Sequence, residues 1–285
     1  MKGITYLRTG LAVVIAALLF GRCMPEAIEV DGIAAARVEI VVSSQMIHDQ
    51  SLLVMVTRTV GALDASDDSN PRTLLTEIAV NDAVVTLTGP YGTDTLRFVG
   101  TGIYSVTGQD FKPDDVYHLT VDSRTLGTVH ATSEVRSKAT FKHVEAELYY
   151  SAFGDTLAQI TYTFEDPEEK NWYMVNVQEV ERDDAVANML NPRAFTRLID
   201  DSSFNGQSYG ERFRVFPRDY RPGDSIAVTI ANVSEEYFRF MKLRQDNRYS
   251  FLEFVSEPID YPSNVIGGRG FFNLYVPEVE FFAFE

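Results

Sequence analysis

Hydrophobic and polar residues alternate at every second position through much of the chain beyond residue 37. Val38, Ile40 and Val42 lie on one side of the first such segment, and residues 52–60 form a second run rich in β-branched side chains. A period of two places successive side chains on opposite faces of a β-strand. The pattern therefore predicts strands from this point onward.

The segment 82–135 carries the clearest strand and turn signals. Turns are predicted at Gly89–Gly92 and Lys112–Asp115, where Gly, Pro and Asp interrupt the alternation. Strands are expected at 83–88, 95–99, 100–104, 116–121 and 129–135. Turn signals about every ten residues are typical of a β-sandwich. We therefore expect residues 37–135 to form an N-terminal β-sandwich.

The second half of the chain repeats this style without repeating the sequence. Alternating segments predict strands at 144–150, 157–164, 172–180, 213–216, 225–233 and 271–284. We expect residues 136–285 to form a C-terminal β-rich domain. Together the two halves predict an all-β protein of two Ig-like or fibronectin-like β-sandwich domains, the second with one or two short helices.

Two segments of the second half carry helix signals. Asn191 and Pro192 are typical of an N-cap and a first helical turn, and they predict a helix near 192–200. Ser234 caps a second helix, predicted at 235–247, whose apolar positions fall on one face. We expect that face to pack on the sheet rather than to hold a cofactor or lipid.

The N-terminus has the form of an export signal. Lys2 and Arg8 are followed by the apolar run Gly10–Gly21, which is too short to span a bilayer comfortably, and Cys23 follows one residue after the run. These features predict a lipoprotein-type signal peptide at residues 1–22. Cys23 is then the acylated first residue of the mature chain.

Arg22 departs from this pattern, because a small residue normally precedes the acylated cysteine. The alternatives are an ordinary secretory peptide cut nearby, or an uncleaved anchor in which Cys23 has no special role. Residues 23–36 contain Pro25 and three acidic residues, and they predict a tether between the membrane and the first sandwich.

Acidic residues outnumber basic residues by 41 to 25, which gives a formal charge of −16. Removal of residues 1–22 makes this charge −19, because that segment holds three basic residues and no acid. Such a charge argues against nucleic acid and against an anionic lipid surface as partners. Cys23 is the only cysteine, so a lipidated chain has no thiol left for a disulfide, a nucleophile or a metal.

Candidate metal ligands are scattered along the chain. The histidines are His48, His118, His130 and His143, and no pair has the H-x-x-x-H spacing of a helical zinc site. His118 and His130 can approach each other across neighbouring strands, although partly buried histidines are the commoner case in a sandwich. The loop 64–70 offers oxygen ligands but lacks the spacing and the distal glutamate of a calcium loop. We expect no metal and no cofactor.

Catalytic motifs are equally weak. The acidic pairs Asp183–Asp184 and Asp200–Asp201 suit hydrolysis only if two carboxylates face each other across a cleft. The run Gly267–Gly270 lacks the lysine and the following helix of a phosphate loop, so it predicts a glycine turn with positive φ. We predict no catalytic residues, and hence a protein that is not an enzyme.

Aromatic residues make up 12% of the chain and include Trp172. Such side chains can stack on sugars or grip peptides, but on strands they commonly fill a sandwich core. We expect core positions for most of them. For the aromatic tail at 271–284, a docking strand for a partner is the alternative to core packing.

Several motifs, taken in order, carry a family resemblance. They are Ala83-Val-Val-Thr-Leu-Thr, Gly102-Ile-Tyr, Tyr117-His-Leu-Thr-Val, Thr163-Phe-Glu-Asp-Pro, Trp172-Tyr, Phe204-Asn-Gly-Gln, Arg221-Pro-Gly-Asp-Ser-Ile, Ser234-Glu-Glu-Tyr-Phe and Pro262-Ser-Asn-Val-Ile-Gly-Gly-Arg-Gly-Phe-Phe. In this combination the chain resembles the Bacteroidota lipoproteins grouped as domain of unknown function 4249, over nearly all of its mature length. The motifs themselves have the composition of turns and strand edges.

The resemblance implies a lipoprotein of the outer membrane, lipid-anchored and facing the cell exterior, often encoded beside a TonB-dependent transporter. It implies no catalytic residue. We expect a non-enzymatic binding or accessory protein of a TonB-dependent uptake system, with a barrel transporter as its partner. The alternatives are an adhesion or envelope-assembly lipoprotein that binds protein partners, and a hydrolase.

Overall fold

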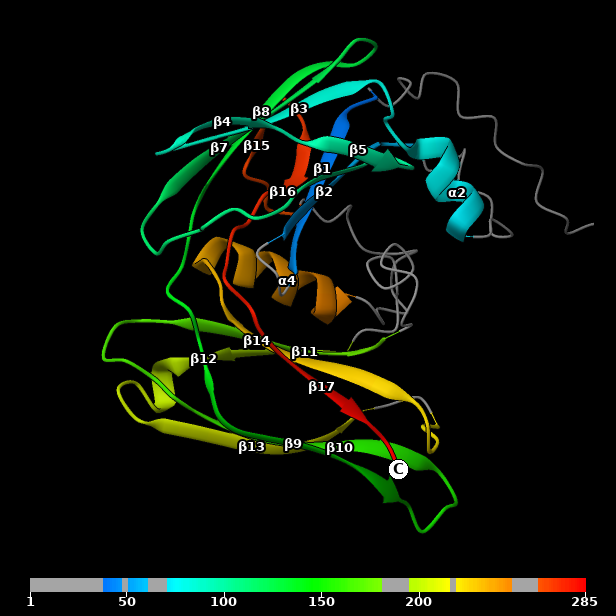
Figure 1. Ribbon diagram of the computed structural model, residues 1–285, viewed down its shortest axis with the longest axis vertical. Helices are drawn as coiled ribbons and strands as arrows, with labels where there is room; N and C mark the ends of the chain where they lie inside the picture. The colour runs from blue at the N-terminus through cyan, green and yellow to red at the C-terminus, as the bar shows by residue number, and fades with distance from the viewer. Residues whose placement is uncertain (1–37, 48–50, 61–70, 181–194, 216–218, 248–260) are drawn as a thin grey trace, which may run out of the picture. The chain divides into compact units, whose positions relative to one another are not determined.

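The computed structural model describes residues 38–47, 51–60, 71–180, 195–215, 219–247 and 261–285. Residues 37–285 form one compact unit. The predicted signal peptide, the tether and Cys23 lie outside the described residues. Within the described part, the strands form two β-sandwiches, so the predicted fold class is confirmed (Figure 1).

The first sandwich joins two sheets. One has the strand order β16-β1-β2-β6-β5, and the other has the order β15-β8-β7-β3-β4. The bounds are β1 Ile40–Ile47, β2 Ser51–Arg58, β3 Ala83–Gly89, β4 Gly92–Thr95, β5 Arg97–Gly100, β6 Ile103–Val106, β7 Val116–Ser123, β8 Gly127–Glu134, β15 Val265–Ile266 and β16 Arg269–Phe271.

Alternation along each strand builds the core of this sandwich. In β7, Tyr117, Leu119 and Val121 are buried, while His118 is exposed and Thr120 is half-buried. These side chains share one cluster with Ile40 and Val42 of β1, on the opposite sheet. Burial of one such aliphatic side chain stabilises the folded state by about 1.5–3 kcal/mol. A helix that the alternation does not indicate, α2 (Pro71–Ile78), precedes β3.

The second sandwich also joins two sheets, with strand orders β13-β10-β9 and β12-β11-β14-β17. Its aromatic and aliphatic core includes Ile160, Tyr162, Val175 and Ile230, all fully buried. The bounds are β9 Phe141–Tyr150, β10 Thr156–Glu165, β11 Trp172–Glu179, β12 Phe195–Asp200, β13 Ser208–Val215, β14 Ser225–Asn232 and β17 Glu278–Ala283.

The sheet β12-β11-β14-β17 is covered on both of its faces. Val228 and Ile230 of β14 belong to the core of the second sandwich. Ala231 of β14 and Met174 of β11 belong instead to the cluster that fills the first sandwich. A strand covered on both sides becomes nearly continuous in hydrophobic residues, as in the run Ile226–Ala231, where Thr229 is the one polar residue.

Helix α4 (Glu235–Asn247) lies on the second face of this sheet, at the residues where the sequence predicts a helix. Ser234 caps it, because its Oγ accepts the Tyr237 N–H at 3.2 Å. Tyr237 and Phe240 contact the ring of Phe271 at centroid distances of 5.4 and 5.3 Å. Since Phe271 belongs to β16, α4 connects the two sandwiches (Figure 1). No helix among the described residues is long and apolar enough to cross a membrane.

The helix predicted near 192–200 is wrong for the residues that the structure describes. Residues 195–200 form strand β12, which pairs antiparallel with β11, and the short 3-10 helix η1 follows at Asp201–Ser203. The cap signals that suggested a helix, Asn191 and Pro192, lie outside the described residues. Pairing with β11 satisfies the backbone groups and buries Ile199, which outweighs local helix propensity.

The predicted division into residues 37–135 and 136–285 does not hold near the C-terminus. β15 pairs with β8, and β16 pairs in parallel with β1, so residues 265–271 belong to the first sandwich. Asn264 fixes this return, because its side chain accepts the Phe272 N–H at 2.9 Å and donates to the Phe272 carbonyl at 2.7 Å. Along the sequence, the last strands of the first sandwich therefore come after most strands of the second.

The glycine turn 267–270 lets the returning segment approach β1 closely. Gly267 and Gly270 have φ values of +85° and +101°, which confirms the predicted positive-φ turn. A Cβ atom on Gly270 would lie 2.0 Å from the carbonyl oxygen of Val42. Glycine is needed at residue 270 both for its backbone conformation and for space.

We predict that Gly270→Ala destabilises the fold by at least about 3 kcal/mol, because it adds a backbone clash to the cost of positive φ. Gly154→Ala is the matched control. Gly154 has a φ of +94°, but a Cβ there would meet nothing within 4 Å. The free energy of unfolding of this control should therefore fall by only about 1–2 kcal/mol. Urea unfolding measures the free energy of unfolding of both variants. Equal losses of this free energy would contradict the close approach of β16 to β1.

Candidate functional site

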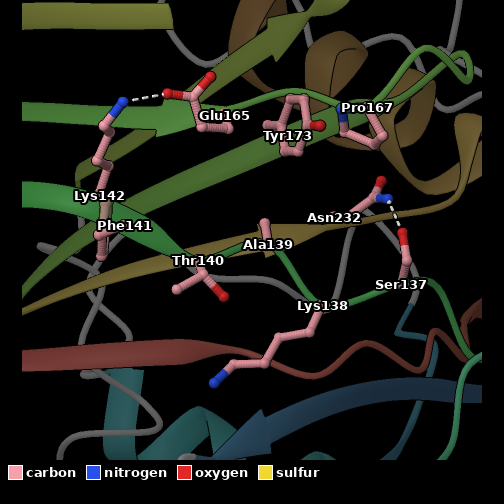
Figure 2. A pocket seen from close by; sticks show the side chains of 10 residues that line it. All are labelled: Ser137, Lys138, Ala139, Thr140, Phe141, Lys142, Glu165, Pro167, Tyr173 and Asn232. Carbon is pink, nitrogen blue, oxygen red and sulfur yellow. Dashed lines mark hydrogen bonds and ion pairs between the residues drawn. The ribbon is translucent and has the colours of Figure 1, made fainter. Parts of the chain in front are cut away.

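A pocket of about 300 Å³ lies where the chain passes from the first sandwich to the second. The connection between β8 and β9 forms one wall, and β9, β10, β11, β14 and the connection between β10 and β11 supply the rest. Figure 2 shows these side chains around the pocket. The lining residues are Ser137, Lys138, Ala139, Thr140, Phe141, Lys142, Glu165, Pro167, Tyr173 and Asn232. A volume of this size is at the lower end of ligand-binding pockets.

The charged side chains that line the pocket are paired with side chains of opposite charge. Lys142 forms an ion pair with Glu165, and Lys138 pairs with Glu278 at 3.1 Å. Glu278 also accepts the backbone N–H of Phe141 at 3.1 Å, which ties β17 to the start of β9. Because each lysine already has a carboxylate partner, the pocket offers polar contacts without a strong net charge.

The polar floor of the pocket is formed by a buried asparagine. Asn232 is 2% exposed and donates to Ser137 Oγ at 3.0 Å and to Asn171 Oδ1 at 2.7 Å. Its own carbonyl oxygen, Oδ1, is buried and has no hydrogen-bond partner among the described residues. A ligand that donates a hydrogen bond would satisfy this acceptor, whose burial without a partner is otherwise costly.

Asp166 organises the wall behind the pocket. Its carboxylate accepts the hydroxyl of Tyr173 and, at 2.9 Å, the N–H of Gly206. Burial and the hydrogen bond to Asp166 raise the pKa of Tyr173 well above its usual value. The Tyr173 hydroxyl therefore stays protonated and acts as a donor at physiological pH.

Three of the motifs that carry the family resemblance meet at this point. Asp166 comes from the motif Thr163–Pro167, Tyr173 from Trp172–Tyr173, and Gly206 from Phe204–Gln207. One hydrogen-bonded cluster joins these three motifs. The cluster fixes the strands β10 and β11 and thereby shapes the pocket wall.

The acidic pair Asp200–Asp201 divides into two structural roles. Asp201 is fully buried and accepts the N–H of Asn171 and the ammonium group of Lys170, which has a raised pKa because of this contact. Asp200 is more exposed and caps η1 by accepting the Ser202 N–H at 3.0 Å, which lowers the pKa of Asp200. Neither carboxylate lines the pocket. Glu165 is the carboxylate among the lining residues, and it is paired with Lys142.

The remaining sequence candidates are distributed as follows. The loop 64–70, the pair Asp183–Asp184 and His48 lie outside the described residues, as Cys23 does. His143 lies on β9 and forms an ion pair with Glu145 at 3.3 Å. Among the described residues, no group of three or more His, Cys, Asp and Glu is placed to hold a metal.

His118 and His130 are both exposed. The partial burial that is commoner for histidines in a sandwich is therefore wrong for these two. They lie on neighbouring strands β7 and β8, as the sequence allows, and their side chains point away from the core. The even spacing in β7 and β8 places the intervening apolar residues inside, so the histidines must face outward.

The aromatic tail is largely part of the cores. Phe271, Phe272, Tyr275 and Phe284 are each at most 5% exposed, whereas Phe281 on β17 is 57% exposed. Core packing therefore accounts for most of the tail, and Phe281 is its outward-facing member. Sequence reasoning missed Asn232 and Asn171, because an asparagine within or beside a strand gives no signal of the cluster that it joins.

Fold and pocket together define a tandem β-sandwich protein with a small polar pocket at the junction of its halves. The chain belongs to the family described as domain of unknown function (DUF4249), whose match covers residues 26–278. No curated protein matches the chain. Among solved structures it is similar to a two-domain fibronectin type-III segment from chicken tenascin, at 10% identity and a TM-score of 0.23, over 86% of this chain and 99% of that one.

We predict that substitutions at the neighbouring Asp200 and Asp201 reduce the free energy of unfolding by different amounts. Asp201→Ala leaves the buried N–H of Asn171 without its acceptor and should cost about 3 kcal/mol of folding free energy. Asp200→Ala removes a cap and an exposed ion pair with Lys170, and it should cost about 1 kcal/mol. Chemical denaturation measures the free energy of unfolding of both variants. If Asp201→Asn, which keeps an acceptor oxygen, were as unstable as Asp201→Ala, the hydrogen bond to Asn171 would not be the cause.

Proposed function

We propose that this protein is an outer-membrane lipoprotein, anchored through acylated Cys23 and exposed on the cell surface. The observation that carries the proposal is the order of segments at the N-terminus. A basic start and a short apolar run end at Cys23, and the family match begins at residue 26, directly after it. This order fits a removable signal that precedes an extracytoplasmic body.

The segment after Cys23 supports this proposal. Residues 24–36 carry three acidic residues and one proline before β1 begins at Ile40. An acidic segment is repelled by anionic headgroups and extends away from them. We infer that residues 23–36 act as a tether that holds the sandwiches clear of the membrane surface.

At the surface, the protein acts as a non-enzymatic accessory of a TonB-dependent uptake system that binds a ligand or docks on the transporter. The pocket beside Asn232 supports a binding role, because it combines an unsatisfied acceptor with the aromatic walls of Tyr173 and Phe141. Its polar groups are fixed by hydrogen bonds to the surrounding strands, and preorganised groups bind at a lower entropic cost.

Lipidation is tested by two matched variants at the cleavage point. Cys23→Ala should abolish labelling with a fatty-acid analogue and leave the precursor unprocessed or the chain released from the membrane. Arg22→Ala places a small residue before the cysteine and should speed processing of the labelled form. Retention and processing of Cys23→Ala at the level of the unaltered protein would contradict the anchor.

Partnership is tested by affinity purification through a C-terminal tag from solubilised outer membranes, with the untagged chain as control. We expect a TonB-dependent barrel to copurify in near-stoichiometric amount. Recovery of envelope-assembly proteins in its place would favour the adhesion or assembly role. Recovery of neither would argue against an uptake accessory while leaving the anchor itself unaffected.

A further inference from the structure

Two exposed histidines lie on neighbouring strands of the first sandwich. The register of β7 and β8 places His118 directly opposite Thr132, and Thr120 directly opposite His130. His118 and His130 are therefore diagonal neighbours on adjacent strands. Diagonal neighbours in an antiparallel pair lie about 7–8 Å apart, within reach of side chains of this length.

Each imidazole is held by a threonine from the facing strand. His118 Nδ1 lies 2.9 Å from Thr132 Oγ1, and His130 Nδ1 lies 3.1 Å from Thr120 Oγ1. Neither Nε2 atom has a hydrogen-bond partner among the described residues. When Nδ1 carries the proton and donates it to the hydroxyl, Nε2 carries a free lone pair. That is the form in which histidine binds metal, with its other ring nitrogen oriented by a second group.

The sheet holds the two histidines on a rigid support. β7 is hydrogen-bonded between β3 and β8, and β8 lies between β7 and β15, so neither strand is at an edge. Residues on such strands are positioned more accurately than residues on loops. The same face also carries Asp122, which accepts a hydrogen bond from Thr128 at 2.8 Å, and the exposed Glu134. The acidic chain as a whole attracts cations to its surface.

We propose that His118 and His130 together bind one divalent late transition-metal ion through their Nε2 atoms. Imidazole nitrogen suits Cu²⁺, Ni²⁺ and Zn²⁺, and among divalent ions Cu²⁺ binds such ligands most tightly. No third protein ligand is placed nearby in the described part of the chain. Solvent completes the coordination, which makes this an exchangeable surface site rather than a structural one. This proposal does not depend on the proposed uptake function.

Calorimetric titration of the full chain in detergent with Cu²⁺ tests the site. Excess Mg²⁺ is included to occupy carboxylates, because it prefers oxygen ligands and does not compete for imidazole. We expect one tight equivalent of Cu²⁺, with Ni²⁺ and Zn²⁺ weaker. His118→Ala and His130→Ala should each weaken binding at least tenfold, and the double variant should be no worse than either, because chelation needs both rings.

Two further sets of variants separate chelation from general histidine binding. His143→Ala and His48→Ala should bind Cu²⁺ as the unaltered chain does. Thr120→Val and Thr132→Val should weaken binding roughly tenfold while leaving the unfolding midpoint unchanged, since the hydroxyls only orient the rings. The proposal is overturned if the unaltered chain binds no Cu²⁺, if loss of His143 or His48 abolishes binding, or if either His118→Ala or His130→Ala binds normally.

Discussion

The return of residues 262–275 to the first sandwich is the constraint on which the rest of this fold depends. β16 lies in parallel against β1, and the Asn273 N–H reaches Ser44 Oγ at 2.8 Å across 229 residues of sequence. Phe272, Leu274 and Tyr275 then complete the core of the first sandwich. The chain leaves the first sandwich after β8, returns to it through β15 and β16, and then adds β17 to the second sandwich, so the two sandwiches are interleaved along the sequence.

This return explains the junction between the halves. α4 packs between β16 and the outer face of the sheet β12-β11-β14-β17, which converts a surface that would face water into an interior. Asp166, Asp201 and Asn171 form hydrogen bonds at the ends of the strands of the second sandwich. The pocket is lined by the connection from β8 to β9 together with residues of the second sandwich.

The functional surfaces are consequently spread over the molecule rather than gathered into one cleft. The anchor proposed at Cys23 precedes the folded unit, the pocket lies at the junction, and the paired histidines lie on the outer sheet of the first sandwich. A sandwich suits such a division, because its two outer faces and its loops are free to carry separate contacts while the cores remain unchanged.

The sequence alone determined the strands, the two-sandwich class and helix α4, because period-two alternation and a Ser–Glu–Glu cap are local signals that the backbone obeys directly. It also determined the glycine turn at 267–270. It misassigned residues 195–200 as helical, because pairing with β11 overrides the local cap. Three features were decided only by the tertiary structure. Residues 265–271 belong to the first sandwich, and Asn232 lines a pocket. His118 and His130 lie on one exposed face. Each of these depends on contacts between residues distant in sequence, whose free energy no local pattern records.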